Sequence, residues 1–282
     1  MSVAPPAGRS LSKSVVIGLL LGGAFLASIL VYKEAFIGLA ALAAAAGSWE
    51  LATAIRTRGW WVQRVPVTVG SVIIMPAAYW GGPIWQWLTA LAIVGALILS
   101  RLVVLLIHPR PGGNKAGDML RDFASAAFVV IYLPLTTSFT VLLLRRPEDG
   151  QLLVLTLVVT VAMVDTFGYL VGRRLGRHKM APGVSPKKSI EGLLASIGAG
   201  LTSVMLFASF GLRLDWWLSL LLAAVILVAA VFGDLAESLI KRDLGIKDMS
   251  SWLPGHGGVM DRLDSILPSA LVTYLFAIFF LN

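Results

Sequence analysis

Residues that could do chemistry gather in one stretch near the end of the chain, residues 238–264, which read SLIKRDLGIKDMSSWLPGHGGVMDRLD. Basic side chains attract phosphates, and glycines let backbone N–H groups come close to phosphate oxygens. Carboxylates in the same stretch are ligands that a hard divalent cation prefers. This mixture between two apolar segments is typical of a site that binds phosphates and an oxygen-coordinated metal ion.

The segment just before this stretch places polar groups on one helical face. Asp234, Glu237, Ser238 and Lys241 are separated by three, four and seven positions, so they share one side of a helix. Such a stripe on a membrane helix needs water or a ligand. Asp261 and Asp264 then lie three apart at the start of the next helix, where the positive helix end would stabilise Asp264 with or without a metal.

A second polar region covers residues 165–192. Asp165 lies inside an apolar run, where an ionised side chain is expensive and is therefore a functional candidate by default. The alternative is a structural pairing with Arg173 or Arg174. Two lysines follow at 187 and 188, just before a helix that Ser189 could cap. A helix N-terminus flanked by lysines suits phosphate oxygens, although basic residues here also fit a plain topology signal.

The composition determines where these residues must sit. Of 282 residues, 57% are hydrophobic and 13% are charged, and the mean hydropathy is +0.85, which indicates an integral membrane protein. A helix needs ~20 apolar residues to cross the membrane. Runs of that kind lie near 15–32, 35–54, 66–81, 84–107, 123–143, 151–172, 190–211, 215–236 and 265–281. We therefore expect an all-α polytopic protein with about nine transmembrane helices and no soluble domain.

The first of these runs is expected to remain as a membrane span. It follows Arg9 and Lys13, as a secretory signal would, but its 18 apolar residues exceed a typical signal core and no small-residue cleavage site follows closely. The chain has no cysteine, so disulfides and thiolate metal ligands are excluded. Oxygen or imidazole ligands would have to hold any metal.

Basic residues favour one orientation. With the N-terminus in the cytoplasm, 18 of the 23 lysines and arginines fall in cytoplasmic segments. We therefore expect a multi-pass protein of the cell (inner) membrane whose active-site loops face the cytoplasm. The net charge of +8 is explained by this topology signal or by attraction to anionic headgroups and phosphates. No recognisable nucleic-acid-binding module is present, so no nucleic-acid partner is expected.

Residues 238–264 resemble the signature of the phosphatidate cytidylyltransferases, or CDP-diacylglycerol synthases. The matching residues, with every spacing met, are Ser238, Lys241-Arg242, Lys247-Asp248, His256-Gly257-Gly258 and Asp261-Arg262-x-Asp264. The upstream part of the resemblance consists of Asp165, Gly172, Gly176 and Ser185-Pro186-Lys187-Lys188. Ser189 stands where the family more often has threonine. The resemblance covers roughly the last 120 residues, so residues 1–120 are expected to be transmembrane helices without recognised motifs and residues 121–282 the catalytic region.

The resemblance implies transfer of a cytidylyl group from CTP to phosphatidic acid, which gives CDP-diacylglycerol and pyrophosphate. In that family, two aspartates hold a divalent cation, and they correspond to Asp234 and Asp261 here. Mg²⁺ is therefore the implied cofactor, with room for a second cation. A homodimer is compatible with the sequence.

The resemblance also implies roles for the other motif residues. The catalytic group would be Asp234, Asp261, Lys241, Arg262 and His256. The substrate-binding group would be Ser185, Lys187, Lys188, Ser238, Lys247, Asp248, Gly257, Gly258 and Asp165. His256 could shape the pocket, give a proton to pyrophosphate or make a structural hydrogen bond.

Two other functions fit parts of the sequence. A cytidylyltransferase or CTP-dependent kinase acting on another membrane lipid, such as a polyprenol, would need the same phosphate-binding groups. An ion or proton transporter would explain the intramembrane carboxylates Asp165 and Asp234. Against a transporter, the phosphate-binding groups cluster on one side, and no corresponding pair of broken spans appears in two halves of the chain.

Overall fold

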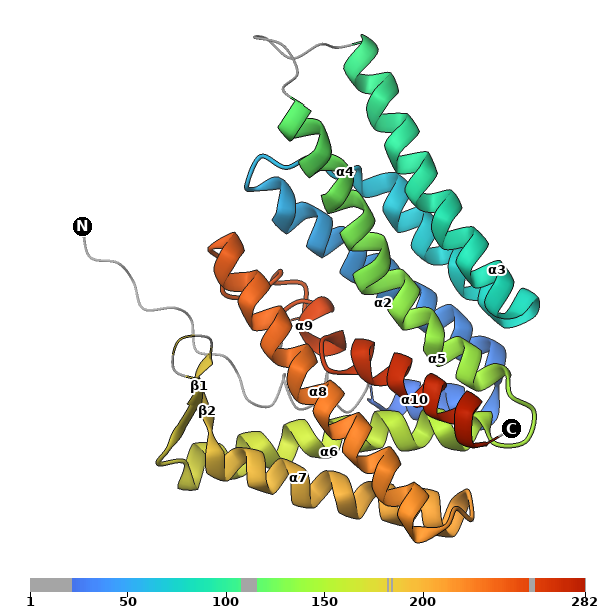
Figure 1. The fold of residues 1–282 in the computed structure, drawn as a ribbon, viewed down its shortest axis with the longest axis vertical. Coiled ribbons are helices and arrows are strands. Elements are labelled where there is room, and N and C mark those ends of the chain that lie inside the picture. Colours follow the sequence, from blue (N-terminus) through green and yellow to red (C-terminus); the bar gives the residue numbers. More distant parts are fainter. Residues whose placement is uncertain (1–21, 108–115, 182, 184, 254–256, 282) are drawn as a thin grey trace.

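The computed structural model describes residues 22–107, 116–181, 183, 185–253 and 257–281. Within these residues the protein is a bundle of helices with one small β-hairpin (Figure 1). Seven helices in this described part of the chain are long and apolar enough to cross a membrane. Several residues used in the sequence argument lie outside the described part of the chain: Arg9, Lys13, Arg110, Lys115, His256 and the side chain of Lys187.

The first half of the bundle contains three long helical elements. These are α2 (Lys33–Arg56), α3 (Arg64–Ile107) and a rod formed by α4 (Ala116–Val130), a π-helical segment (Ile131–Leu135) and α5 (Thr136–Arg145). The second half contains α6 (Gly150–Leu175), α7 (Ile190–Val204) with its π-helical extension (Met205–Gly211), α8 (Trp216–Leu244), α9 (Met260–Leu263) and α10 (Ile266–Phe280).

Helix α3 is a hairpin of two helical arms rather than one rod (Figure 1). Its turn is at Gly82, whose φ of 77° and ψ of −164° are open to glycine and strained for other residues. Pro83 follows and starts the second arm, a position where its missing N–H costs nothing. The arms pack closely, since a Cβ on Gly70 would come within 2.7 Å of Ile93. The predicted runs 66–81 and 84–107 are these two arms.

The predicted number of nine spans is not confirmed. The all-helical membrane architecture is confirmed, with seven candidate spans among the described residues, one of which, α3, combines two predicted runs. The described part of the first predicted run is a short apolar helix, Gly22–Val31. The sequence also gave no sign of the antiparallel hairpin of β1 (Lys179–Ala181) and β2 (Ser185–Ser189), which pairs Lys179 with Ser189.

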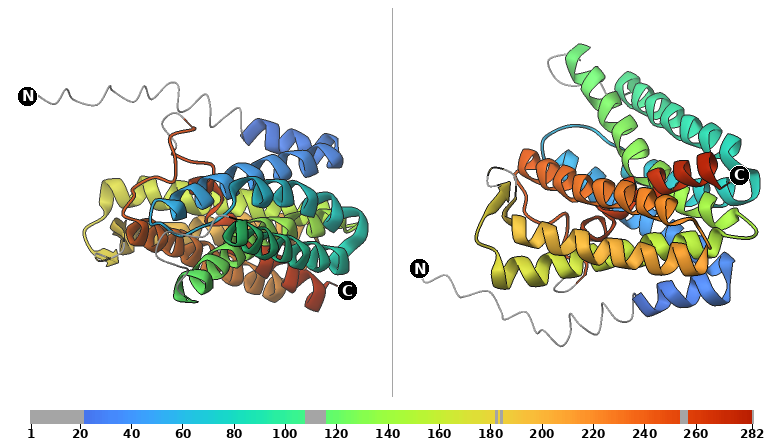
Figure 2. Two further views of the ribbon diagram at one scale, coloured as in Figure 1. Left: turned by 90° about the horizontal axis from the view of Figure 1, so that it is seen from above. Right: turned by 60° about the horizontal axis from the view of Figure 1, so that its bottom comes forward.

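Helices α6 and α7 lie antiparallel, side by side, and the β-hairpin joins them (Figures 1 and 2). Ser189 caps α7 as predicted, because its hydroxyl oxygen accepts a hydrogen bond from the Gly192 N–H at 3.2 Å. Such a cap stabilises a helix by ~1 kcal/mol. Glycines allow the close approach: a Cβ on Gly192 would lie 2.7 Å from the Gly168 carbonyl oxygen. The lysine-bearing strand is thus held against the end of α6.

Helices α8 and α10 cross at a second close contact. A Cβ on Gly233 would lie 2.3 Å from the Asp264 carbonyl oxygen and 2.7 Å from Pro268. Helix α8 ends at Gly245, which takes a left-handed conformation with φ of 70°, after Lys241 and Arg242 in its last turn. The chain then returns to the bundle through the short helix α9.

The connections divide between the two ends of the bundle. The loop between α2 and α3, the β-hairpin and the last turn of α8 lie at one end, while the Gly82 turn and the α5–α6 and α7–α8 connections lie at the other (Figure 1). The first group carries Arg58, Lys179, Lys188, Lys241 and Arg242, and we call it the basic end.

Candidate active site

A cavity of about 680 Å³ lies between α6, α7, β2 and α8 near the basic end. Its charged lining includes Asp165 from α6, Lys188 from β2 and Asp234 from α8. Lys188 Nζ lies 2.5 Å from Asp234 Oδ2, and both side chains are partly exposed. Apolar residues such as Val164 and Leu193 line much of the rest. The two sequence regions that were predicted to bind phosphate therefore meet in one place.

Glycine residues shape the wall of this cavity where α6 faces α7. Gly168, Gly172 and Gly192 all belong to the lining. A side chain on Gly172 would lie 3.2 Å from the Ser189 hydroxyl and 3.5 Å from the Gly192 Cα. The predicted family glycines at 172 and 176 thus serve helix packing, which brings Lys188 close to α6 and α8.

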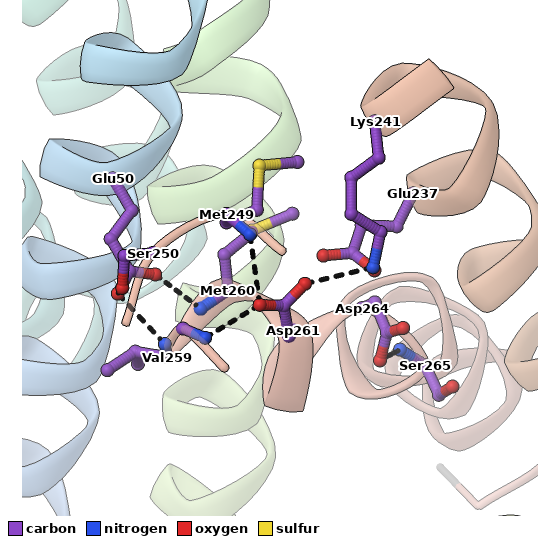
Figure 3. Close-up of polar contacts among 11 residues, drawn as sticks. Glu50, Glu237, Lys241, Met249, Ser250, Val259, Met260, Asp261, Asp264 and Ser265 are labelled. Carbon is purple, nitrogen blue, oxygen red and sulfur yellow. Dashed lines mark hydrogen bonds and ion pairs between the residues drawn. The ribbon is translucent and has the colours of Figure 1, made fainter. Parts of the chain in front are cut away.

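A second charged cluster lies where α8 meets α9 (Figure 3). Lys241 Nζ is 2.5 Å from Glu237 Oε2 and 2.9 Å from Asp261 Oδ1, so one ammonium joins two carboxylates. Glu237 is fully buried and was expected only to share a face with Lys241. Desolvation of a carboxylate is costly without a charged partner, and Lys241 provides it.

Asp261 is held from both sides by the backbone as well. Its Oδ2 accepts hydrogen bonds from the Met249 N–H at 3.1 Å and the Gly258 N–H at 2.6 Å (Figure 3). Gly257 makes room for this carboxylate, since its φ is 82° and a Cβ there would lie 2.6 Å from Asp261 Oδ2. The N–H of Gly258, expected to face a phosphate, donates to Asp261 in this structure.

The two clusters share one electrostatic environment. Asp165, Asp234 and Asp264 repel one another, while Lys188 and Arg262 attract Asp165 and Lys241 attracts Asp264. Five carboxyl groups (Asp165, Asp234, Glu237, Asp261 and Asp264) therefore lie near three cations (Lys188, Lys241 and Arg262). The buried Oε1 of Glu237 has no hydrogen-bond partner in the described part of the chain. Carboxyl groups therefore outnumber cationic groups at this site, five to three.

The remaining predicted residues occupy less central positions. Ser185 on β2 and Ser238 on α8 are half-buried, whereas Lys247, Asp248 and Arg262 are exposed. Neither Lys247 nor Asp248 belongs to the lining of the cavity between α6, α7 and α8.

Sequence reasoning missed Glu50. It lies on α2, in the region without motifs, yet its carboxylate accepts hydrogen bonds from residues next to Asp261. The sequence did contain a signal for Glu50, because it is a carboxylate inside the apolar run 35–54, and such a residue is a functional candidate by default.

The chemistry of the donor set is compatible with Mg²⁺. No group of three or more His, Cys, Asp or Glu residues with metal-binding geometry occurs among the described residues. Mg²⁺ does not require one, because it is commonly bound by one or two carboxylates together with substrate phosphates and water. Asp234 and Asp261 are carboxylates of the chemical type that such an ion takes, and each is ion-paired with a lysine in this structure.

The fold and this site together define a multi-pass helical membrane protein with a charged, phosphate-compatible cavity between its C-terminal helices. The chain belongs to the cytidylyltransferase family, whose model matches residues 12–280.

Three relatives illustrate the similarity, and each is named phosphatidate cytidylyltransferase. The chain is 34% identical to the protein of Mycobacterium bovis over 276 residues, which covers 95% of this chain and 89% of the relative. It is 35% identical to that of Mycobacterium leprae over 287 residues, or 96% and 88% of the two chains. The protein of Brucella melitensis is 32% identical over 208 residues, or 70% and 73%.

Proposed function

We propose that this protein is a phosphatidate cytidylyltransferase, which converts CTP and phosphatidic acid to CDP-diacylglycerol and pyrophosphate. The observation that carries the proposal is a pair of charged clusters, Lys188 with Asp234 and Lys241 with Asp261, which both act on the buried Asp264 carboxyl. Membership of the cytidylyltransferase family and the names of its relatives support the choice of nucleotide and lipid. The basic end would face the cytoplasm of the inner membrane, where CTP is available.

The reaction joins a phosphate oxygen of phosphatidic acid to the α-phosphorus of CTP. The bond from that phosphorus to the oxygen of the β-phosphate breaks, and pyrophosphate leaves with the electron pair. The lipid phosphate is already anionic near neutral pH, so a strong general base is not required. The protein has to place two anionic substrates together and offset their charge.

Lys188 and Lys241 are suited to this task because their ammonium groups are partly buried at the two ends of the charged region. Each is held by a carboxylate, and each would exchange that carboxylate for a phosphate oxygen when substrate enters. A hydrogen bond between an ammonium and a phosphate contributes ~1.5–3 kcal/mol. Apolar residues of the cavity, including Val164 and Leu193, would face the lipid rather than the nucleotide.

Asp234 and Asp261 would hold Mg²⁺ together with phosphate oxygens of the substrates. When bound, the ion would supply charge stabilisation to the phosphates and to the departing pyrophosphate. The lysines released from these two carboxylates would then be free to contact phosphates. This assignment rests on the family resemblance and on the excess of carboxyl groups at the site.

The experiment that tests the function uses the purified full-length protein in detergent. Phosphatidic acid is supplied with each of the four nucleoside triphosphates, and pyrophosphate release and labelled lipid product are measured. We expect product only with CTP and only with phosphatidic acid. Release with CTP and a polyprenol or another lipid acceptor, but not with phosphatidic acid, would instead favour an enzyme for a different lipid.

A further inference from the structure

Glu50 is a buried carboxylate that reaches from α2 to the chain around Asp261. Its residue is 2% exposed, and it accepts three hydrogen bonds (Figure 3). Oε1 accepts from the Ser250 hydroxyl at 2.5 Å and from the Val259 N–H at 3.0 Å. Oε2 accepts from the Met260 N–H at 2.8 Å. All three donors belong to the connection between α8 and α10, which includes the short helix α9.

We propose that Glu50 is a positioning residue that sets the place of the Asp261 carboxylate for the reaction. The inference rests on the proposed function, since Asp261 matters there as a ligand of Mg²⁺ and a partner of Lys241. Glu50 is not among the residues that line the cavity between α6, α7 and α8. It acts through the backbone of Val259 and Met260, which immediately precede Asp261.

Glu50 and Asp261 accept hydrogen bonds from neighbouring residues of the same two segments, 249–250 and 258–259. Glu50 binds Ser250 and Val259, whereas Asp261 binds the neighbouring residues Met249 and Gly258. Met249, which donates to Asp261, is next to Ser250, which donates to Glu50. In the same way, Gly258 donates to Asp261 and is next to Val259, which donates to Glu50. If Glu50 releases its donors, the two N–H groups that fix Asp261 lose their support, and the carboxylate turns relative to Lys241.

A carboxylate is required because the surrounding groups are donors. The Ser250 hydroxyl can rotate and accept, but the N–H groups of Val259 and Met260 can only donate. Glutamine at position 50 has one acceptor oxygen, so its NH₂ would face one of these two N–H groups. An unsatisfied buried donor and the lost charge-assisted bond lower stability or activity, because both groups are shielded from water.

Gly258 shows how closely the carboxylate fits. A Cβ on Gly258 would lie 2.6 Å from Glu50 Oε2 and 2.9 Å from Oε1. Gly258→Ala would therefore force the backbone at position 258 and the Glu50 carboxylate apart. The substitution disturbs the same contact from the opposite side.

The test combines a spectroscopic readout with kinetics. The chain has no cysteine, so Ser251→Cys, at an exposed position beside Ser250, takes a single nitroxide label. In Glu50→Gln and Gly258→Ala we expect faster label motion by electron paramagnetic resonance. With CTP and phosphatidic acid, kcat should fall about tenfold to a hundredfold while the KM for CTP changes by less than about threefold.

The matched control is Ser48→Ala, two positions away on α2. Ser48 is fully buried and shares a 2.8 Å hydrogen bond with Ser71 of α3, away from the labelled loop. It should leave the label motion and kcat unchanged. If Glu50→Gln does not fold, Ser250→Ala removes a single contact to the same carboxylate and should give a smaller change in the same direction.

Each outcome separates this inference from the proposed function. Unchanged label motion in a folded Glu50→Gln protein overturns the anchoring role. Faster label motion with unchanged kcat overturns the positioning role. An absence of activity in the unsubstituted protein overturns the proposed function, while the label measurement still decides whether Glu50 anchors the loop.

Discussion

At the scale of single residues, Lys241 is the most constrained cation of the site. It joins Glu237 and Asp261, and the buried Glu237 side chain has no other cationic partner within a hydrogen-bond distance among the described residues. Removing the ammonium would leave a buried carboxylate without its counter-ion. A structural role and a catalytic role of Lys241 therefore have to be separated by experiment.

We predict that Lys241→Met lowers the free energy of unfolding by ~3–5 kcal/mol, the cost of breaking a buried ion pair. Denaturant titration in mild detergent measures this. Adding Glu237→Gln should restore most of the stability, because a neutral side chain needs no counter-ion, but it should not restore cytidylyl transfer. The exposed Lys247→Met is the stability control, expected to change the free energy of unfolding by less than ~0.5 kcal/mol. Full activity of the double variant would show that Lys241 is structural only.

The paired aspartates give a second residue-scale prediction. Asp234→Asn and Asp261→Asn should each lower kcat by ~10²–10³, because a hard dication needs the negative charge that asparagine lacks. If both hold one ion, the double variant should be little worse than either single variant. Rates measured over a range of Mg²⁺ concentrations test this, and excess Mg²⁺ should partly restore the single variants. Losses that multiply would argue against a shared ion and would favour separate ion pairs with Lys188 and Lys241.

At the scale of elements, the packing of α6 against α7 sets the distance between Lys188 and the other charged groups. We predict that Gly192→Ala separates the two helices, because the added Cβ would lie 2.7 Å from the Gly168 carbonyl oxygen and 3.1 Å from the Gly172 Cα. Overpacking of this kind costs ~1–3 kcal/mol of stability and should reduce activity. Thermal unfolding and pyrophosphate release are the measurements.

Gly198→Ala is the matched control on the same helix, since a Cβ there meets nothing within 4 Å. It should be neutral or stabilise α7 by up to ~1 kcal/mol through helix propensity. Equal effects of the two substitutions would mean that glycine is not needed for the close approach.

The elements also show what sequence patterns can and cannot predict. Long apolar runs and the Ser189 cap follow from local rules, and these features were predicted well. The α3 hairpin was predicted as two runs, because Gly82-Pro83 breaks the pattern, although nothing local shows how the arms pack. The role of Glu50 depends on donors that are 200 to 210 residues away, so no pattern near position 50 could name them. The roles of the C-terminal motif residues stay a prediction from the family resemblance, and which cation pairs with which carboxylate required the fold.

At the scale of the whole molecule, the basic end is the face proposed to meet the cytoplasm. We predict that Ser251→Cys reacts with a membrane-impermeant maleimide only after the cell membrane is opened. Glu148→Cys, at an exposed position in the connection between α5 and α6, should react in intact cells. Labelling of position 251 in intact cells would reverse the proposed orientation.

The contact between Glu50 and the Asp261 region also has a consequence for biosynthesis. Met260 is 210 residues beyond Glu50, so a ribosome adding ~5–20 residues per second needs roughly 10–40 s to supply the last donor. During that interval α2 carries a carboxylate whose partners have not been made. We therefore predict that a nascent chain truncated before Val259 accumulates to a lower level in membranes than the same truncated chain carrying Glu50→Ala, measured by pulse-chase labelling. Equal half-lives of the two truncated chains would mean that the unpartnered Glu50 carboxylate does not affect degradation. A shorter half-life of the chain that carries Glu50 would mean that this side chain marks incomplete copies for removal.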